Sequence, residues 1–556
     1  METTDPEIFT LNRTAWDDDR CGLDGLPEGR GLNMAHEAVE RHAAGPLADR
    51  PAIRWPGHAD APAELTYRQL SERSNRFANV LSDLRLERGE TVCVLSDRVP
   101  ALYEAAVGIW KFGAVFCPLF PVFGPEPIFQ RLAASGAKVL VTSARLYSRK
   151  VASIRERLPK LAHVILTDAA EDGPNGLWSF ARLMEAADNR FAISPTAPED
   201  RAILHYTSGT TGDPKGAVHV HDAARVHAAT GREVLRLGPG TAFWCTADPA
   251  WVTGTAYGIL APLMCGALNI VDSEDFDPER WLQILSEQQV AVWYTTPTAL
   301  RRLMRADIPS AASGAPNSLT DIFSVGEALH PDVVTWTGRR FGVEVRDTWW
   351  QTETGGIMIA NLPGEPVRPG SIGRPLPGIE AAVIRLDPAR RASVIQAPGV
   401  IGQLALKPGW PSMFRGYLDD PVATRLCYTG EWYLTGDLVR RDGSGYFSFV
   451  GRSDDIIKTA GHMVGPAEVE SALVSHPAVA EAGVVGKPDP LSGQIVKAFV
   501  TLEPGTIPGD SLRLELIAHA RRLLGAALAP REIEFTDQLP KNRSGKILRR
   551  LLREDG

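Results

Sequence analysis

A segment that combines glycines, hydroxyl side chains and a lysine spans residues 206–216, with the sequence YTSGTTGDPKG. Glycine lets the backbone approach a ligand closely, and hydroxyls beside a lysine bind phosphate oxygens. The segment is not the G-x-x-x-x-G-K-[ST] loop, because no serine or threonine follows a Gly-Lys pair. A Gly/Ser/Thr run by itself is more often a surface loop, so other segments must support this interpretation. The expected phosphate-binding residues are Thr207, Ser208, Gly209, Thr210, Thr211 and Lys215.

Short apolar strands alternate with helical segments in the part of the chain that precedes this segment. Residues 91–96, 138–142 and 163–167 are apolar and rich in β-branched residues, and apolar side chains recur at helical spacing over 100–112. Strands separated by single helices are typical of parallel sheets with helices packed on their faces. We therefore expect an α/β fold with a large N-terminal domain of parallel or mixed sheets and flanking helices.

The pattern changes twice in the last third of the chain. Residues 370–446 form short segments rich in glycine and proline, which predicts a small β-rich subdomain. A polar stretch near residue 451 then precedes a compact pattern of helices and strands, long enough for a small separate domain. We predict a large domain over residues 1–451 and a small mobile α+β domain over residues 452–556.

Composition excludes several classes of protein. The chain has 556 residues, a net charge of −8 and ordinary globular hydrophobicity, so we expect no nucleic-acid partner. Its six cysteines show no C-x-x-C spacing, which argues against a zinc site and favours a reducing cytoplasm. The uncharged stretch 249–271 is long enough to span a bilayer, but it contains prolines and glycines. We interpret it as buried in the core and expect neither a membrane partner nor a secretory signal.

Five segments, in order, resemble the motifs of the adenylate-forming superfamily, which comprises acyl-CoA synthetases, peptide-synthetase adenylation domains and luciferases. They are YTSGTTGDPKG at 206–216, TWWQTETG at 348–355, YLTGD at 433–437, GRSDD at 451–455 and PKNRSGK at 540–546. The resemblance covers essentially the whole chain. It implies that a carboxylate attacks the α-phosphate of ATP with Mg²⁺ present and displaces pyrophosphate to form an acyl-adenylate. The acyl group is then transferred to the thiol of coenzyme A, and AMP is released.

The resemblance also assigns roles to residues. Both reactants are anions, so cations placed on the developing charge lower the barrier. Lys546 would bridge the carboxylate and the α-phosphate, Glu353 would hold Mg²⁺, and Thr207 would contact the phosphates. Asp437 would bind the ribose hydroxyls near Arg452. The other nucleotide-binding residues implied are Gly326, Glu327, Ala328, Asp347, Thr348, Trp349, Trp350, Gln351 and Thr352, with Trp349 stacked on adenine.

The residue at position 350 is the most informative one for the acid substrate. Many members of the superfamily have glycine there, which opens an acyl tunnel, whereas this chain has tryptophan. A buried indole fills a large volume and moves only with strain, so it should admit only a very short acid. The surrounding sequence resembles that of acetyl-CoA synthetases, and by that resemblance Val252, Thr253, Val325, Gly326 and Trp350 line an acetate pocket. The alternative is that Trp350 packs in the core and the pocket lies elsewhere.

The second half-reaction requires the thiol of coenzyme A to reach the acyl carbon. The resemblance implies a rotation of the small domain about Asp454, which withdraws Lys546 and presents Ala460, Gly461 and His462 to coenzyme A. Many acetate-activating relatives carry an arginine where Met463 stands, so this contact must differ here. The chain is also shorter than the best-known acetyl-CoA synthetases. It resembles a branch of shorter enzymes that is similar to the medium-chain acyl-CoA synthetases.

The prediction is an acetate–CoA ligase that works through acetyl-adenylate. The alternatives are a ligase for propionate or another short or medium-chain acid, a luciferase-like oxygenase, and an inactive nucleotide-binding homologue. Pocket discrimination of one methylene is worth only about 1–3 kcal/mol, so the sequence leaves acetate and propionate open. Because acetylation would remove the charge of Lys546, a lysine acetyltransferase and a deacetylase are expected partners.

Overall fold

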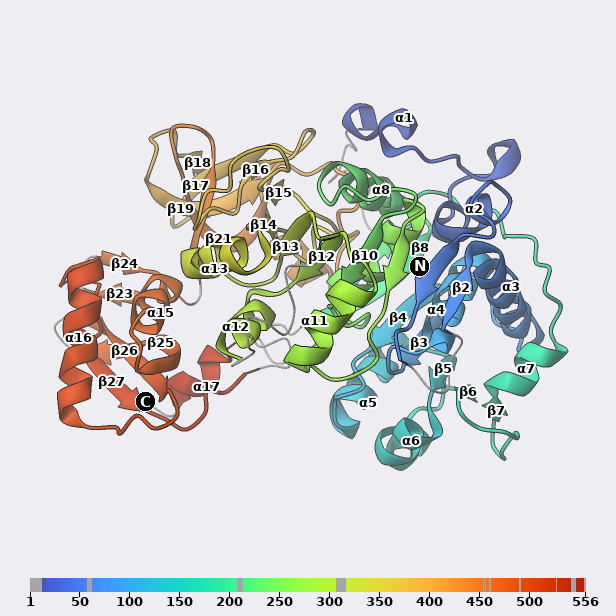
Figure 1. Cartoon of the computed structure of the whole chain (residues 1–556). Helices are drawn as coiled ribbons and strands as arrows, with labels where there is room; N and C mark the ends of the chain where they lie inside the picture. The colour runs from blue at the N-terminus through green and yellow to red at the C-terminus, as the bar shows by residue number, and fades with distance from the viewer. Residues whose placement is uncertain are drawn as a thin grey trace.

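The computed structural model describes most of the chain in four sheets with flanking helices (Figure 1). The described residues are 13–57, 63–207, 214–306, 317–453, 455, 457–459, 462–489, 492–526, 528–541 and 547–554. The N-terminal part carries short helices before the first sheet: η2 (Arg13–Trp16), α1 (Asp18–Cys21), η3 (Pro27–Gly29), η4 (His36–Glu40) and α2 (Arg41–Ala43).

The first large sheet has seven strands in the order β7-β6-β5-β3-β4-β8-β9. All neighbours are parallel except the last pair, β8 and β9. Both faces are covered, since alternate residues of β3 enter two different hydrophobic clusters. The strands are β3 (Thr91–Leu95), β4 (Val115–Leu119), β5 (Val139–Thr142), β6 (His163–Leu166), β7 (Leu177–Ser179), β8 (Arg201–Thr207) and β9 (Lys215–Val220).

Helix α4 illustrates how the sequence sets the elements around this sheet. It spans Pro100–Phe112, where Pro100 suits the first turn and Gly113, with φ +85°, ends the helix in the left-handed region. The other helices of this region are α3 (Tyr67–Asp83), α5 (Pro125–Ser135), α6 (Ala144–Leu146), η5 (Tyr147–Val151), η6 (Ala152–Arg157), α7 (Phe180–Ala186) and α8 (Ala223–Glu233).

The second large sheet has nine strands in the order β16-β15-β14-β13-β12-β10-β11-β1-β2. Its centre, from β14 to β1, is parallel, and both edges are antiparallel. The strands are β1 (Pro51–Arg54), β2 (Glu64–Thr66), β10 (Ala242–Cys245), β11 (Leu268–Ile270), β12 (Val292–Thr295), β13 (Asp321–Ser324), β14 (Val345–Trp349), β15 (Ile359–Ala360) and β16 (Arg374–Pro375). Helices α11 (Pro278–Glu287), α12 (Pro297–Arg305) and α13 (Pro331–Phe341) connect its strands.

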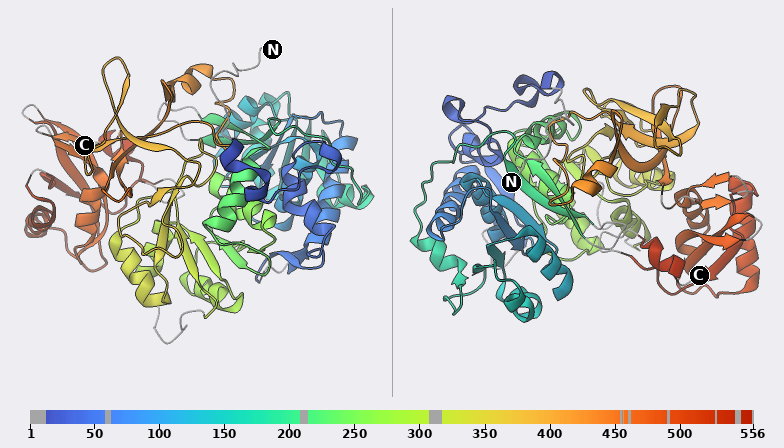
Figure 2. Two further views of the ribbon diagram at one scale, coloured as in Figure 1. Left: turned by 90° about the horizontal axis from the view of Figure 1, so that it is seen from above. Right: turned by 180° about the vertical axis from the view of Figure 1, so that it is seen from behind.

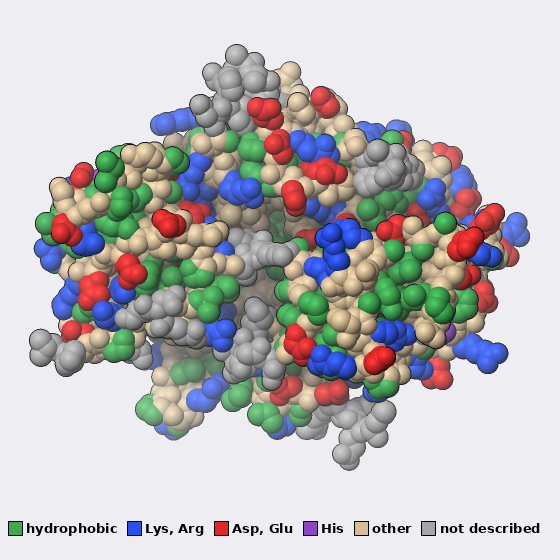
Figure 3. Space-filling view, turned by 90° about the horizontal axis from the view of Figure 1, so that it is seen from below, with side chains coloured by type: hydrophobic (Ala, Val, Ile, Leu, Met, Phe, Trp, Pro, Cys, Tyr) green, Lys and Arg blue, Asp and Glu red, His purple; other side chains and the backbone are tan. Residues whose placement is uncertain are grey.

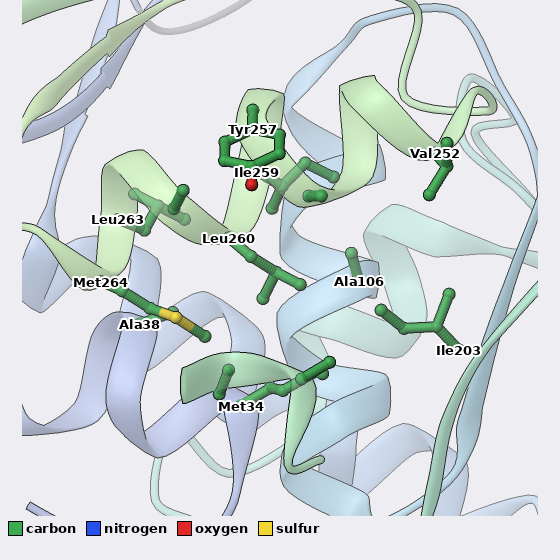
Figure 4. Close-up of a cluster of buried hydrophobic side chains, with 14 of the residues drawn as sticks. Met34, Ala38, Ala106, Ile203, Val252, Tyr257, Ile259, Leu260, Leu263 and Met264 are labelled. Carbon is green, nitrogen blue, oxygen red and sulfur yellow. The ribbon is translucent and has the colours of Figure 1, made fainter. Parts of the chain in front are cut away.

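The uncharged stretch 249–271 lies in the core, as its prolines and glycines predicted. It forms α9 (Val252–Thr255), η7 (Ala256–Leu260) and α10 (Ala261–Met264) before entering β11. Side chains of this stretch share one buried cluster with Met34, Ala106 and Ile203, which come from elements far away in sequence (Figure 4). Among the described residues, none of the helices has the length and apolar character needed to cross a bilayer.

A smaller antiparallel sheet and a C-terminal domain complete the molecule (Figure 2). The sheet comprises β17 (Ala381–Leu386), β18 (Ala392–Val394), β19 (Ile401–Leu406), β20 (Tyr428–Thr429), β21 (Trp432–Arg441) and β22 (Phe447–Arg452), with α14 (Pro421–Leu426) beside it. The C-terminal domain contains β23 (Ile457–Thr459), β24 (His462–Val464), β25 (Val479–Asp489), β26 (Gly493–Leu502), β27 (Glu532–Phe535), α15 (Pro466–Val474), α16 (Asp510–Leu524) and α17 (Arg549–Glu554). The expected mixed α/β fold with a β-rich subdomain and a smaller C-terminal domain is confirmed.

The C-terminal domain has its own hydrophobic core and touches the larger part through polar side chains. Nδ1 of His330 lies 2.5 Å from the hydroxyl of Ser471. Arg305 lies 3.6 Å from Glu503, and Arg440 lies 3.9 Å from Glu468. Contacts of this kind resemble a transient interface more than a shared core.

Candidate active site

Polar and aromatic residues of the predicted site gather where the central parallel strands of the second sheet end. Strands β12, β13 and β14 run in the same direction, so their carboxyl ends lie at one edge. In open α/β sheets ligands bind outside this edge. Val325 follows β13, and Trp350 follows β14, which places the predicted pocket residues on neighbouring strands.

The segment predicted to bind phosphate connects the strands of the β8–β9 hairpin. Thr207, the last residue of β8, pairs with Lys215, the first residue of β9. Both are partly exposed, and because paired residues of antiparallel strands share one face, their side chains lie on the same face of the hairpin. Ser208, Gly209, Thr210 and Thr211 lie outside the described residues.

Glu353 is held by a tyrosine that the sequence analysis missed. The hydroxyl of Tyr417 donates a hydrogen bond to Oε1 of Glu353 at 2.6 Å. The ring of Tyr417 also lies 5.4 Å from Nζ of Lys215. Burial and the Glu353 carboxylate raise the pKa of Tyr417, so its hydroxyl stays protonated and remains a donor. Tyr417 therefore connects the residue predicted to hold Mg²⁺ with the lysine predicted to hold phosphate.

Backbone pairing explains how Tyr417 reaches this position. The segment around it pairs with β9, since the amide of Val218 bonds the carbonyl of Gly416 at 3.0 Å and the amide of Leu418 bonds the carbonyl of Gly216 at 2.7 Å. A glycine-tyrosine pair far downstream gives no chemical signal on its own, so residue types could not have identified it.

Asp437 is the acceptor at the centre of a hydrogen-bonded network. Its Oδ2 accepts from the indole N–H of Trp349 at 2.9 Å and from the amide of Gln351 at 3.0 Å. Its Oδ1 accepts from the guanidinium of Arg452 at 3.0 Å. An ionised carboxylate has about four acceptor positions, so roughly one remains for a ligand hydroxyl. The hydroxyl of Tyr433 fixes Gln351 in turn, at 3.0 Å from Oε1.

The predicted adenine loop is shaped by a close aromatic contact. Gly326 has φ +89°, and a Cβ at this position would lie 2.6 Å from the ring of Trp251. Only glycine combines that backbone conformation with that contact. The carboxylate of Glu327 accepts bonds from Thr298 at 2.6 Å and Arg301 at 2.8 Å, so it is held against α12. Ala328 follows in the same loop.

Asp347 lies inside the sheet. It is 4% exposed and accepts bonds from the hydroxyl of Ser324 at 2.7 Å and from the amide of Thr348 at 3.1 Å. Burial raises its pKa to about 8, and the two hydrogen bonds only partly oppose this shift. Asp347 therefore carries a proton at neutral pH and joins the ends of β13 and β14.

The side chains predicted to line the acid pocket are buried. Trp350 is 7% exposed, and its indole N–H donates to the hydroxyl of Tyr294 at 3.0 Å. Its ring also meets the edge of Tyr257 at a centroid distance of 5.2 Å. Val252, Thr253 and Val325 are likewise buried, the first two in the helix that leads directly into η7 and Tyr257.

Buried histidines surround the loop that carries Glu353. His219 lies 3.1 Å from the carbonyl of Ser412, and His227 lies 2.7 Å from the carbonyl of Gly355. Burial lowers the pKa of His219 to about 3 and that of His227 to about 4. Both rings are therefore neutral and act as hydrogen-bonding supports. Within the part of the chain that the structure describes, no group of three or more His, Cys, Asp or Glu residues could hold a metal.

A hollow lies between the C-terminal domain and the larger part, and both basic and acidic side chains lie along its edges (Figure 3). A cavity of about 310 Å³ lies between the domains, lined by Thr298, Arg301, Arg302, Arg305, Glu481 and Lys541. Because Thr298 and Arg301 also bond Glu327, this cavity adjoins the predicted adenine loop. Basic side chains predominate in its lining, and Arg301, Arg305 and Lys541 are ion-paired with Glu327, Glu503 and Glu481.

The small-domain residues of the predicted site lie partly beyond the described residues. Lys546, Ala460, Gly461 and the proposed hinge Asp454 all lie outside them. Lys541 and Ile547, the described residues on either side of the segment that carries Lys546, form an antiparallel bridge. His462 begins β24 and pairs with Thr459 across a short hairpin. Met463 pairs with Lys458 in the same hairpin.

Comparison with known proteins places these features in a family. A model described as AMP-binding enzyme matches residues 39–418, and one described as AMP-binding enzyme C-terminal domain matches residues 468–546. An acetyl-coenzyme A synthetase of Bacillus subtilis (strain 168) is 42% identical over 529 residues, which cover 94% of this chain and 90% of that protein. An acetyl-coenzyme A synthetase of Pyrobaculum aerophilum is 36% identical, with coverages of 94% and 82%.

Solved structures agree with this match. An anthranilate CoA ligase in complex with anthranoyl-AMP superposes with a TM-score of 0.85 at 29% identity, covering 94% of this chain and 97% of that one. An acyl-CoA synthetase of Brucella canis superposes with a TM-score of 0.74 at 34% identity, covering 98% and 99%.

Proposed function

This chain belongs to the AMP-binding enzyme family, and we propose that it joins acetate to the thiol of coenzyme A, with cleavage of ATP to AMP and pyrophosphate. The enzyme is an AMP-forming acid–CoA ligase, and its small-molecule substrates are the acid, ATP and coenzyme A. The observation that carries the choice of a short acid is Trp350, a buried and hydrogen-bonded indole at the end of β14.

The first half-reaction is an attack of the acid carboxylate on the α-phosphate of ATP. Thr207 and Lys215, together with Ser208, Gly209, Thr210 and Thr211, hold the β- and γ-phosphates and neutralise their charge. Lys546 places its ammonium between the two anionic reactants. Support comes from Thr207 and Lys215, which are neighbours at the mouth of the hairpin.

The carboxylate of Glu353 is a suitable ligand for a magnesium ion. One of its oxygens accepts the Tyr417 hydroxyl, and the described residues leave the other without a protein hydrogen bond. Magnesium prefers carboxylate and phosphate oxygens and keeps several waters, so one protein carboxylate suffices. When bound, the ion supplies positive charge against the triphosphate; Tyr417 and Lys215 orient the protein side of that site.

The nucleoside is held by the loops that follow β13 and β14. Gly326, Glu327 and Ala328 border the adenine, Trp349 stacks on it, and Asp437 binds the ribose hydroxyls with Arg452 beside it. Thr348, Gln351 and Thr352 complete this wall. The network around Asp437 supports the assignment, because it fixes an acceptor with room for a further hydroxyl. Asp347 supports the wall from within the sheet.

The acid enters the pocket formed by Val252, Thr253, Val325, Gly326 and Trp350. The second half-reaction then uses the small domain, residues 452–556, which turns about Asp454 against the larger domain, residues 1–451. This turn withdraws Lys546 and brings Ala460, Gly461 and His462 to coenzyme A. The polar contacts between the domains support such a motion, since they can separate without exposing an apolar core.

The experiment that tests the function measures turnover with acetate, propionate, butyrate and octanoate. Acid-dependent exchange of pyrophosphate into ATP separates an enzyme from an inactive nucleotide-binding protein. AMP release that requires coenzyme A, with and without oxygen, separates a ligase from an oxygenase. Acetate should give the highest kcat/KM, and a preference for octanoate would refute the proposal.

Control by acetylation of Lys546 belongs to the same proposal. Acetylation removes the positive charge that adenylation needs, so an acetyltransferase and a deacetylase would act as partners. Mass spectrometry on cells with abundant acetyl donors should detect the modified lysine, and its complete absence would contradict the idea.

The proposed location of the enzyme is the reducing cytoplasm. Its six cysteines are all unpaired, which supports this location.

A further inference from the structure

We propose that Tyr294 is the positioning residue that sets the chain-length limit of this enzyme by holding Trp350 in place. The inference rests on the proposed function, and it extends that function to a residue in the middle of the second sheet. Tyr294 lies in β12 and is fully buried. Its hydroxyl meets two groups, the indole N–H of Trp350 at 3.0 Å and the hydroxyl of Thr348 at 2.8 Å.

The direction of each hydrogen bond in the series from Trp350 to Ser324 is fixed. The hydroxyl of Thr348 donates to the carbonyl of Ser324 at 2.8 Å, so its oxygen must accept from Tyr294. The hydroxyl of Tyr294 therefore donates to Thr348 and keeps a lone pair for the indole N–H, which can only donate. The relay runs from Trp350 through Tyr294 and Thr348 to a backbone carbonyl, and no member can reverse its role.

This bond distinguishes Trp350 from four of the other buried tryptophans of the chain. Within the described residues the indole N–H groups of Trp16, Trp244, Trp281 and Trp293 are buried without a partner. Packing alone therefore determines where those rings lie. Trp350 has packing and a directional bond, and a rotation of its ring would leave a buried donor unpaired.

A second tyrosine closes the other side of the indole. Tyr257, on η7 in the cluster of Figure 4, meets Trp350 edge-on at 5.2 Å and Tyr294 at 5.7 Å. Its own hydroxyl is fixed, because it accepts from the amide of Ile357 and pairs with Thr230, both at 2.8 Å. Tyr257 limits the space beside the indole, and Tyr294 supplies the only hydroxyl bonded to its N–H among the described residues.

The test replaces Tyr294 with phenylalanine, which removes one oxygen and keeps the ring. The kcat/KM for propionate and butyrate, divided by that for acetate, should rise about three- to tenfold, as expected for one lost hydrogen bond. The matched control is Tyr67→Phe, since Tyr67 is equally buried and its hydroxyl bonds the carbonyls of Leu263 and Ala267. The ratio between acids is insensitive to a general loss of folded enzyme, which affects all acids equally.

A spectroscopic readout makes the test independent of activity. In protein labelled with 5-fluorotryptophan, the fluorine resonance of Trp350, assigned by its loss in Trp350→Phe, should shift or broaden in Tyr294→Phe and stay unchanged in Tyr67→Phe. If Tyr294→Phe fails to fold, Thr348→Val removes the acceptor of the relay and should raise the same ratio. An unchanged ratio, or an equal rise in Tyr67→Phe, overturns the inference. Absence of acetate-dependent turnover in the wild-type enzyme would refute the proposed function. The fluorine shift would still test whether Tyr294 holds Trp350.

Discussion

The hydroxyl of Tyr417 lies 2.6 Å from Oε1 of Glu353, although 64 positions separate the two residues in the sequence. The bond connects a carboxylate to a segment that pairs with the hairpin predicted to bind phosphate. A shift of the hairpin would therefore be transmitted to Glu353, which couples the predicted magnesium-binding carboxylate to the predicted phosphate-binding hairpin.

Replacement of Tyr417 by phenylalanine should weaken the response of the enzyme to magnesium. The carboxylate of Glu353 loses the donor that orients it, and loss of such a supporting bond typically costs about ten- to hundredfold in metal affinity or activity. The measurement is a magnesium titration of acetate-dependent AMP formation. Tyr446→Phe is the matched control, since Tyr446 directly precedes β22 and its hydroxyl donates to Glu365 at 2.7 Å. Equal responses in the two variants would contradict the role of Tyr417.

Replacement of Trp350 by glycine should admit longer acids. Removal of the indole opens space below the nucleotide, so the ratio of butyrate to acetate kcat/KM should increase by roughly ten- to hundredfold. Trp55→Gly is the control, because that indole is equally buried, bonds a carbonyl at 3.1 Å and meets the edge of Tyr103. Both variants should lose stability, and only Trp350→Gly should change acid preference.

Replacement of Asp437 by asparagine should raise the KM for ATP. The change removes the charge opposite Arg452 and turns one acceptor into a donor that faces other donors, which costs about 1.5–3 kcal/mol or roughly ten- to hundredfold. Steady-state kinetics at saturating acetate give the value. Asp442→Asn, which breaks an exposed pair with Arg368 at 3.0 Å, should leave the KM for ATP unchanged. A similar increase in both would assign the effect to lost stability.

Replacement of Asp347 by asparagine should remove a dependence of stability on pH. The unfolded carboxyl loses its proton near pH 4, whereas the folded one keeps it until pH about 8. Between these values the folded state binds more protons, so the wild-type free energy of unfolding falls as pH rises. Asparagine keeps the acceptor for Ser324 and does not titrate. The urea midpoints of the wild type and of Asp347→Asn, measured at pH 5, 6, 7, 8 and 9, should change by different amounts up to pH 8 and in parallel above it. A constant difference between the two proteins over the whole range would refute the raised pKa of Asp347.

Local chemistry explains why so much of the fold was predictable. Helix α4 begins at Pro100 and ends before Gly113, as the sequence indicated, because the proline and the glycine set the backbone at those points. The strands of the parallel sheets were recognisable because burial on both faces requires continuous apolar runs. The family motifs likewise named Glu353, Asp437 and Trp350, since each motif is short and its residues are close in sequence.

Sequence by itself determined the reaction class, the motif residues and the indole at position 350, because each depends on residue types within a few positions. Only the tertiary structure decided that Tyr417 fixes Glu353, that Tyr294 and Tyr257 hold Trp350, and that Asp347 is buried and protonated. The contacts join residues 56 to 93 positions apart, and the pKa of Asp347 depends on how completely its side chain is buried. A hydrogen bond or a shifted pKa arises from distance and dielectric surroundings in three dimensions, and neither is written into the spacing of residues along the chain.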